Sequence, residues 1–180
     1  MNKHYFIAIK VPEQIANTII QERDKTNLHQ THKILPIAED LHITLYYLGH
    51  IAESTLEQII HSLHSLEWDS FKLKTRGVAH FGSETTPRVV YTALEESNHL
   101  QLLQQKIVQL LGNFIEVQER NDFTAHITIA KKWATKESLK LTEFNLSDLA
   151  FDVLSFSVFT VNMNRSPRYE EISTVKWRRD

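Results

Sequence analysis

The sequence contains no cysteine among its 180 residues. This absence excludes disulfide bonds, thiolate zinc sites, iron–sulfur ligation and catalysis by a cysteine nucleophile. It also agrees with a reducing compartment, so we expect a cytoplasmic protein.

An excess of charge of one sign is lacking as well. The chain has 20 Lys and Arg against 22 Asp and Glu, which gives a formal net charge of −2. Tight binding along a long nucleic acid needs a clear excess of cations facing phosphates, so we do not expect it. A local pocket for a small anionic group remains compatible with this balance.

Long hydrophobic runs are also absent. The apolar stretches are far shorter than the ~20 residues that a membrane-spanning helix needs. The start of the chain leads into an amphipathic strand pattern rather than a signal peptide, and we expect no membrane partner. The chain does have 42% hydrophobic and 23% charged residues, a balance typical of one globular domain with a substantial core.

Hydrophobic periodicity predicts alternating strands and helices. The predicted strands cover residues 5–10, 41–48, 71–81, 88–94, 125–130, 151–161 and 169–177. Four helices are predicted. The first follows Pro12 and carries Ile15, Ile19 and Ile20, and the second begins at a capping box of Ser54 and Glu57. The third is capped by Ser97 or Asn98, and the fourth is a short helix capped by Thr135. Residues 27–33 are expected to form a loop, and residues 82–87 a turn.

The order strand–helix–strand–helix–strand occurs twice in the chain. We therefore predict a single α+β domain over residues 1–180, made of two similar halves that meet near residues 82–88. No low-complexity linker separates the halves, so they should pack as one body. Each half is expected to bury its aliphatic side chains under its own helices.

The tripeptide His-Ile-Thr occurs in both halves, as His42–Thr44 and as His126–Thr128. A shuffled chain of this composition would contain roughly 0.07 copies, so coincidence is a poor explanation. In a strand, the His and Thr of each motif share one face and the aliphatic residues share the other. If a pseudo-two-fold axis relates the halves, two imidazoles and two hydroxyls meet in one cleft.

This group of side chains suits the hydrolysis of a phosphodiester. One imidazole can take a proton from the attacking water while the other gives a proton to the leaving oxygen. The hydroxyls of Thr44 and Thr128 can donate hydrogen bonds to phosphate oxygens. Because the two motifs are nearly identical, the residues alone do not assign the acid and the base.

A plainer interpretation is that both motifs are strands with solvent-facing polar residues. No metal or cofactor is expected, because two imidazoles without nearby carboxylates or thiolates make an incomplete metal site. The other eight histidines lack a repeated context, and we expect surface or loop positions for them. His61 and His64 have helical spacing but no third ligand nearby.

Four segments of the chain resemble a known family. They are YFIAIKVPE (residues 5–13), EDLHITLYYLG (39–49), PRVVY (87–91) and FTAHITIAKK (123–132). With the two His-x-Thr motifs, they are similar to the 2H (two-histidine) phosphoesterases, and within these to the bacterial RNA 2′,3′-cyclic phosphodiesterases, the 2′-5′ RNA ligase-like or LigT/ThpR proteins.

The resemblance implies a bilobal fold in which two antiparallel sheets line a central cleft, with helices packed outside. It implies cleavage of an RNA 2′,3′-cyclic phosphate to a 2′-phosphomonoester, with 2′-5′ ligation as the reverse activity. His42 would donate the proton to the leaving 3′ oxygen and His126 would accept the proton of water. Thr44 and Thr128 would bind the phosphate.

Two positions depart from the family pattern: Ala125 stands where Pro is usual, and Lys131 where Arg is usual. Lysine keeps the charge but not the two-pronged hydrogen bonding of arginine. Lys131 and Arg168, with Lys132 and Arg165, are candidates for a rim that binds the RNA strand, and Tyr47, Phe81 or Tyr169 for stacking a terminal base. The alternative is solvated surface for the cations and core packing for the aromatic rings.

The expected partner is an RNA 3′ end that carries a 2′,3′-cyclic phosphate. Two other functions remain open. One is a phosphodiesterase for a small molecule, such as ADP-ribose 1″,2″-cyclic phosphate, acyl-phosphopantetheine or a nucleotide ester. The other is an RNA-end binding module without turnover. We expect a monomer, because the two motifs of one chain complete the site.

Overall fold

The structure is a computed structural model that describes residues 3–118, 123–136, 138 and 146–178. The helices in these ranges are α1 (Glu13–Asp24), α2 (Leu28–Thr31), α3 (Glu53–Leu63) and α4 (Asn98–Leu111), with a 3-10 turn η1 (Ala38–Asp40). The strands are β1 (Tyr5–Lys10), β2 (His32–Ile34), β3 (His42–Gly49), β4 (Phe71–Gly82), β5 (Pro87–Leu94), β6 (His126–Trp133), β7 (Ser147–Val153), β8 (Ser155–Val161) and β9 (Tyr169–Lys176). This combination of an antiparallel sheet with helices confirms the α+β class.

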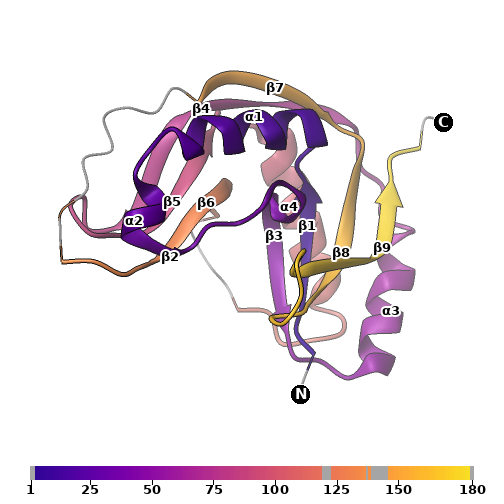
Figure 1. Cartoon of the computed structure of the whole chain (residues 1–180). Coiled ribbons are helices and arrows are strands. Elements are labelled where there is room, and N and C mark those ends of the chain that lie inside the picture. The colour runs from indigo at the N-terminus through magenta and orange to yellow at the C-terminus, as the bar shows by residue number, and fades with distance from the viewer. Residues whose placement is uncertain (1–2, 119–122, 137, 139–145, 179–180) are drawn as a thin grey trace.

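The described strands form one antiparallel sheet in the order β7-β4-β5-β6-β3-β1-β8-β9, with β2 paired to β6. The order is symmetrical about its centre, where the two motif strands β3 and β6 are neighbours. In the described residues, the pairing between them is the single pair Ile43 and Ile127. Figure 1 shows β4, β5 and β6 on one side of this junction and β3, β1, β8 and β9 on the other.

This arrangement corrects the expectation of two separate sheets. The sheet is continuous because the motif strands pair with each other at its centre. Strands from the two halves of the sequence also pair with each other. β4 of the first half pairs with β5 and β7 of the second, and β8 of the second half pairs with β1 of the first. Residues 82–87 form the turn of the β4–β5 hairpin, in which Gly82 is paired with Pro87. The division into two similar halves stays a prediction.

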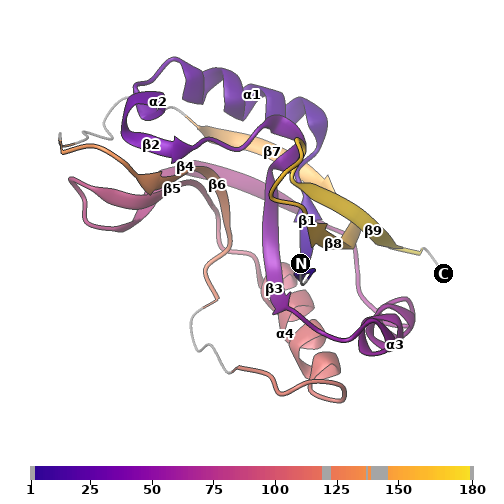
Figure 2. The ribbon, with the colours of Figure 1, turned by 60° about the horizontal axis from the view of Figure 1, so that its bottom comes forward.

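The helices that cover the motif strands come from the opposite half of the sequence. Helix α4 packs against β3, where the Gln104 side chain donates a hydrogen bond to the Leu45 carbonyl at 3.4 Å. Helix α1 packs against β6, where the buried Arg23 donates to the Ile129 carbonyl at 3.4 Å. Figure 2 shows α1 and α4 on opposite sides of the strands. The expectation that each half covers its own motif is therefore wrong. Helix α4 of the second half covers the motif strand of the first half, and α1 of the first half covers the motif strand of the second.

Residues 27–33, predicted as a loop, contain α2 and the start of β2. Buried polar side chains explain this difference. His32 is 4% exposed, donates from Nε2 to the Pro87 carbonyl at 2.9 Å, and accepts at Nδ1 from the Thr31 hydroxyl at 2.9 Å. Because these polar side chains are satisfied inside the protein, a polar sequence forms ordered structure here.

Residues 151–161, predicted as one strand, form the end of β7 and all of β8, with Leu154 between them. β7 pairs with β4, whereas β8 pairs with β1 and β9. The positions that belong to the main core change parity at the break, from Phe151 and Val153 to Phe156 and Val158. This parity change is a signal in the sequence, because one strand keeps its buried side chains on one face.

Helix α3 is confirmed, but its predicted capping box is wrong. The helix begins at Glu53, and the N-cap Ala52 makes no side-chain hydrogen bond. Ser54 therefore lies inside the first turn, two residues after the N-cap position, and does not act as the cap for Glu57.

The N-cap of α4 is confirmed, because the Ser97 Oγ accepts a hydrogen bond from the Leu100 N–H at 3.2 Å. The short helix predicted after Thr135 falls largely on residues outside the described ranges.

The alternation of the motif strands is confirmed. Ile43, Leu45, Ile127 and Ile129 are at most 2% exposed and belong to the main core. The His and Thr residues of both motifs are partly exposed on the other face. The core packing of one face therefore holds the polar face in place.

Candidate active site

The pairing of Ile43 with Ile127 brings the two motifs together across β3 and β6. Because the strands run antiparallel, the residue before Ile43 lies across from the residue after Ile127. In this register His42 lies toward Thr128 and Thr44 lies toward His126. His42, Thr44 and Thr128 line the same cavity.

The His42 ring is oriented by its own backbone neighbours and by two aromatic rings. Its Nδ1 lies 2.7 Å from the Asp40 carbonyl oxygen, which only accepts hydrogen bonds, so Nδ1 carries the proton. The rings of Phe6 and Tyr169 each have centroids 4.9 Å from that of His42. These contacts leave Nε2 as the nitrogen available for chemistry.

His126 has the same kind of environment. Its Nδ1 donates to the Thr124 carbonyl at 2.8 Å. The rings of Phe81 and Tyr91 lie 5.0 and 5.2 Å from the His126 ring, centroid to centroid. Both imidazoles therefore have the same tautomer, with Nε2 unprotonated in the neutral form.

Burial lowers the pKa of His42 from 6.5 to about 4. The charges of Lys131 and His126 contribute to this lowering, while the hydrogen bond to the Asp40 carbonyl and the charge of the Asp40 carboxylate oppose it. Burial also lowers the pKa of His126, opposed by its bond to the Thr124 carbonyl. At neutral pH both imidazoles are uncharged, and each Nε2 can accept a proton.

Asp40 is a site residue that the sequence reasoning missed. Its side chain is buried, and its carboxylate accepts the N–H of Arg168 at 2.9 and 3.1 Å and the N–H of Tyr169 at 3.2 Å. It therefore fixes the start of β9 against the start of β3 and brings the Tyr169 ring to His42. Its position two residues before His42, inside the family-like segment, was the available signal.

A cavity of about 300 Å³ lies over the first motif. Its lining includes five of the predicted site residues, which are His42, Thr44, Tyr47, Thr128 and Lys131. Phe6, Pro36, Asp40, Val161, Met163 and Tyr169 complete it. His126 does not line this cavity, although its charge acts on His42.

The other predicted binding residues are distributed around this cavity. Arg168 lines a neighbouring cavity, whereas Lys132 lines neither of the two. Phe81 lies against His126. The departure at Lys131 keeps a cation in the site, and its Nζ donates to the Tyr169 hydroxyl at 3.3 Å.

Tyr47 is an exposed aromatic side chain at the edge of the cavity. It is 53% exposed, and its hydroxyl lies 2.5 Å from the Nδ1 of His4. A ring held at its polar end with a free face is suited to stacking a base.

Metal ligands and membrane spans can be examined within the described ranges. There, no three His, Asp or Glu side chains are grouped so that they could hold a metal ion. No helix in the same ranges has the length and apolar character to cross a membrane.

Comparisons with known proteins identify the family. Residues 11–163 match the model of the 2′-5′ RNA ligase superfamily. An RNA 2′,3′-cyclic phosphodiesterase of Bacillus subtilis (strain 168) is 30% identical over 173 residues, which cover 94% of this chain and 93% of that protein. A protein of the same name from Geobacillus stearothermophilus is 25% identical over 175 residues, covering 94% of this chain and 56% of its own length.

Solved structures confirm the fold. The crystal structure of E. coli LigT complexed with 3′-AMP superposes with a TM-score of 0.83 over 97% of each chain, at 19% identity.

Proposed function

Because the chain belongs to the 2′-5′ RNA ligase superfamily, we propose that it is a hydrolase that opens the 2′,3′-cyclic phosphate at the 3′ end of RNA. The name of the Bacillus subtilis relative, which matches nearly the whole chain, supports this substrate. The observation that supports the proposal is the pairing of Ile43 with Ile127, the central residues of the two motifs, together with the matching Nδ1 hydrogen bonds of His42 and His126.

The proposed reaction uses one imidazole for each proton. Nε2 of His126 takes a proton from water as the water oxygen attacks phosphorus, and the bond between phosphorus and O3′ breaks. Nε2 of His42 gives its proton to O3′. The product is a 2′-phosphomonoester with a free 3′-hydroxyl, and the two imidazoles have exchanged protonation states.

The hydroxyls of Thr44 and Thr128 and the ammonium of Lys131 face the phosphate in this scheme. They stabilise the negative charge on its oxygens, which is the main requirement of phosphoryl transfer. These groups supply the protons and the positive charge without a metal ion, so the proposal includes activity in EDTA. An RNA 5′-hydroxyl in place of water forms a 2′-5′ linkage by the same step.

The bound phosphate also prepares His42 for its role. In the free protein, burial and the charge of Lys131 keep the pKa of His42 at about 4, so this imidazole is neutral. An anionic phosphate in the cavity compensates the charge of Lys131 and favours the imidazolium. The acid therefore forms as the substrate binds.

The test is an assay with an oligonucleotide that ends in a 2′,3′-cyclic phosphate, performed in EDTA, with identification of the product. We expect a 2′-monophosphate. Ala variants of His42 and of His126 should each lower turnover about 10²- to 10⁴-fold with unchanged unfolding curves. His61→Ala, which removes an exposed imidazole on α3, is the matched control.

Other outcomes would contradict the proposal. Full activity in either histidine variant excludes the two-histidine mechanism, and loss of activity in EDTA excludes metal independence. Turnover of small cyclic phosphates alone would identify a small-molecule phosphodiesterase, and stoichiometric binding without product would identify an RNA-end binding module. A cytoplasmic location and a monomeric state stay predictions from the sequence.

A further inference from the structure

A second cavity of about 420 Å³ adjoins the cavity over His42. The two share five lining residues, which are Pro36, Asp40, Lys131, Met163 and Tyr169. The second cavity continues between β2 and the segment that connects β8 to β9, where its lining includes Lys33, Arg165 and Arg168. The shared residues place the two cavities side by side.

The charges around the second cavity are almost all positive. Lys33, Lys131, Arg165 and Arg168 line it, and the one acidic residue in the lining is Asp40. The Asp40 carboxylate is already occupied by the backbone N–H groups of Arg168 and Tyr169.

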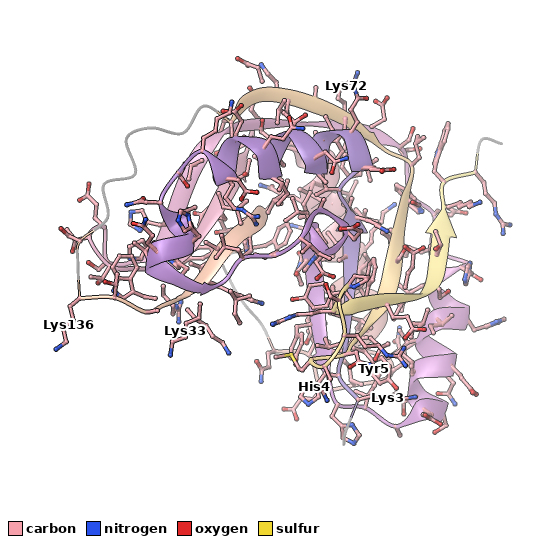
Figure 3. The ribbon with its side chains drawn as sticks, viewed as in Figure 1. Lys3, His4, Tyr5, Lys33, Lys72 and Lys136 are labelled. Atoms are coloured by element: carbon pink, nitrogen blue, oxygen red, sulfur yellow. The ribbon has the colours of Figure 1, made fainter. Side chains whose placement is uncertain are left out.

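None of the four cations forms an ion pair in the part of the chain that the structure describes. Lys72, in contrast, pairs with Asp152 at 3.7 Å. Figure 3 shows Lys33 on the opposite side of the molecule from Lys72. A cavity with several unpaired cations and no free carboxylate attracts anions.

We propose that this second cavity binds the phosphodiester that precedes the terminal nucleotide of the RNA. The inference rests on the proposed function, because the terminal cyclic phosphate must lie at His42. The first cavity, at about 300 Å³, lies at the lower end of ligand sites and holds the terminal group. The preceding phosphate then reaches Lys33 and Arg165.

Two consequences follow for the substrate. The protein prefers an oligonucleotide with a cyclic phosphate end over a mononucleotide 2′,3′-cyclic phosphate, because only the oligonucleotide has a phosphate for the second cavity. The protein also contacts only a few phosphates at the end of the RNA, which agrees with its net charge of −2.

The experiment compares a mononucleotide 2′,3′-cyclic phosphate with a tetranucleotide that has the same terminal nucleotide. The variant is Lys33→Ala with Arg165→Ala, two exposed side chains whose removal should not affect folding. The control, Lys72→Ala with Arg76→Ala, removes the same charges from β4, outside both cavities.

We expect wild-type protein and the control to have a higher kcat/KM for the tetranucleotide. The Lys33 and Arg165 variant should lose about five- to tenfold on the tetranucleotide, mainly through KM, and be unchanged on the mononucleotide. Equal losses on both substrates, an unchanged tetranucleotide preference, or no preference in wild type would overturn the inference.

A binding measurement separates this inference from the proposed function. Fluorescence anisotropy gives the Kd of the labelled tetranucleotide for the wild type and both double variants. If the wild type turns over neither substrate, the proposed function fails. In that case, an increase in Kd confined to the Lys33 and Arg165 variant supports the second cavity as a phosphate site, and equal Kd values overturn it.

Discussion

Replacing His42 with glutamine should make the free energy of unfolding less dependent on pH. In the folded protein, burial lowers the pKa of His42 to about 4, whereas its ordinary value is 6.5. Between these values the unfolded chain binds more protons than the folded chain, so acid favours unfolding. The stability associated with the neutral imidazole is complete above pH ~6.5 and is lost as the pH falls toward ~4.

The magnitude follows from the difference between the two pKa values. One pKa unit corresponds to about 1.4 kcal/mol, so the full effect is at most about 3 kcal/mol. Between pH ~7.5 and ~5 the expected loss is about 2 kcal/mol. Because His42 keeps partial contact with solvent, this figure is an upper value.

Urea unfolding at several pH values between about 7.5 and 5 measures this effect. The burial of His32 and His126 lowers their pKa values as well, and both residues are present in both proteins, so the comparison measures the effect of replacing His42. His61→Gln controls for the loss of an exposed imidazole.

The same pH dependence in wild type and His42→Gln would refute the reasoning. An NMR titration that places the pKa of His42 at or above 6.5 would contradict it directly.

Three further predictions test the site and its support. Inorganic phosphate should raise the pKa of His42 by about one unit or more, because the anion compensates the positive charge of Lys131. An NMR titration in which this pKa stays the same would exclude phosphate binding beside the His42 ring. Asp40→Asn should lower the free energy of unfolding, measured in urea, by about 1–3 kcal/mol, and it should also lower turnover. The reason is that the carboxylate accepts hydrogen bonds from the N–H groups that hold Tyr169 against His42. An unchanged free energy of unfolding would show that these hydrogen bonds contribute nothing. Ser97→Ala should lower the free energy of unfolding by about 1 kcal/mol, because α4 loses its N-cap hydrogen bond, and it should retain full activity. A large loss of activity would contradict a purely structural role for this cap.

Local patterns allowed prediction of the elements and of the polar face of the motifs. Alternation along 42–45 and 126–129 was sufficient, because successive side chains of a strand point to opposite faces in any tertiary context. The errors came where a distant partner decides the outcome. His32 is in an ordered strand because the Pro87 carbonyl accepts a hydrogen bond from its Nε2. The strand break at Leu154 reflects two different pairing partners.

The sequence by itself determined which polar side chains of the two motifs share a face. The repeated His and Thr share a face by backbone geometry, and the absence of cysteine excluded thiol chemistry. Only the tertiary structure decided that β3 and β6 are neighbours, that Asp40 anchors the start of β9, and that a basic cavity adjoins the cavity over His42. The physical reason is range: side-chain alternation is a property of neighbouring residues, whereas strand pairing and cavities depend on contacts between residues far apart in the chain.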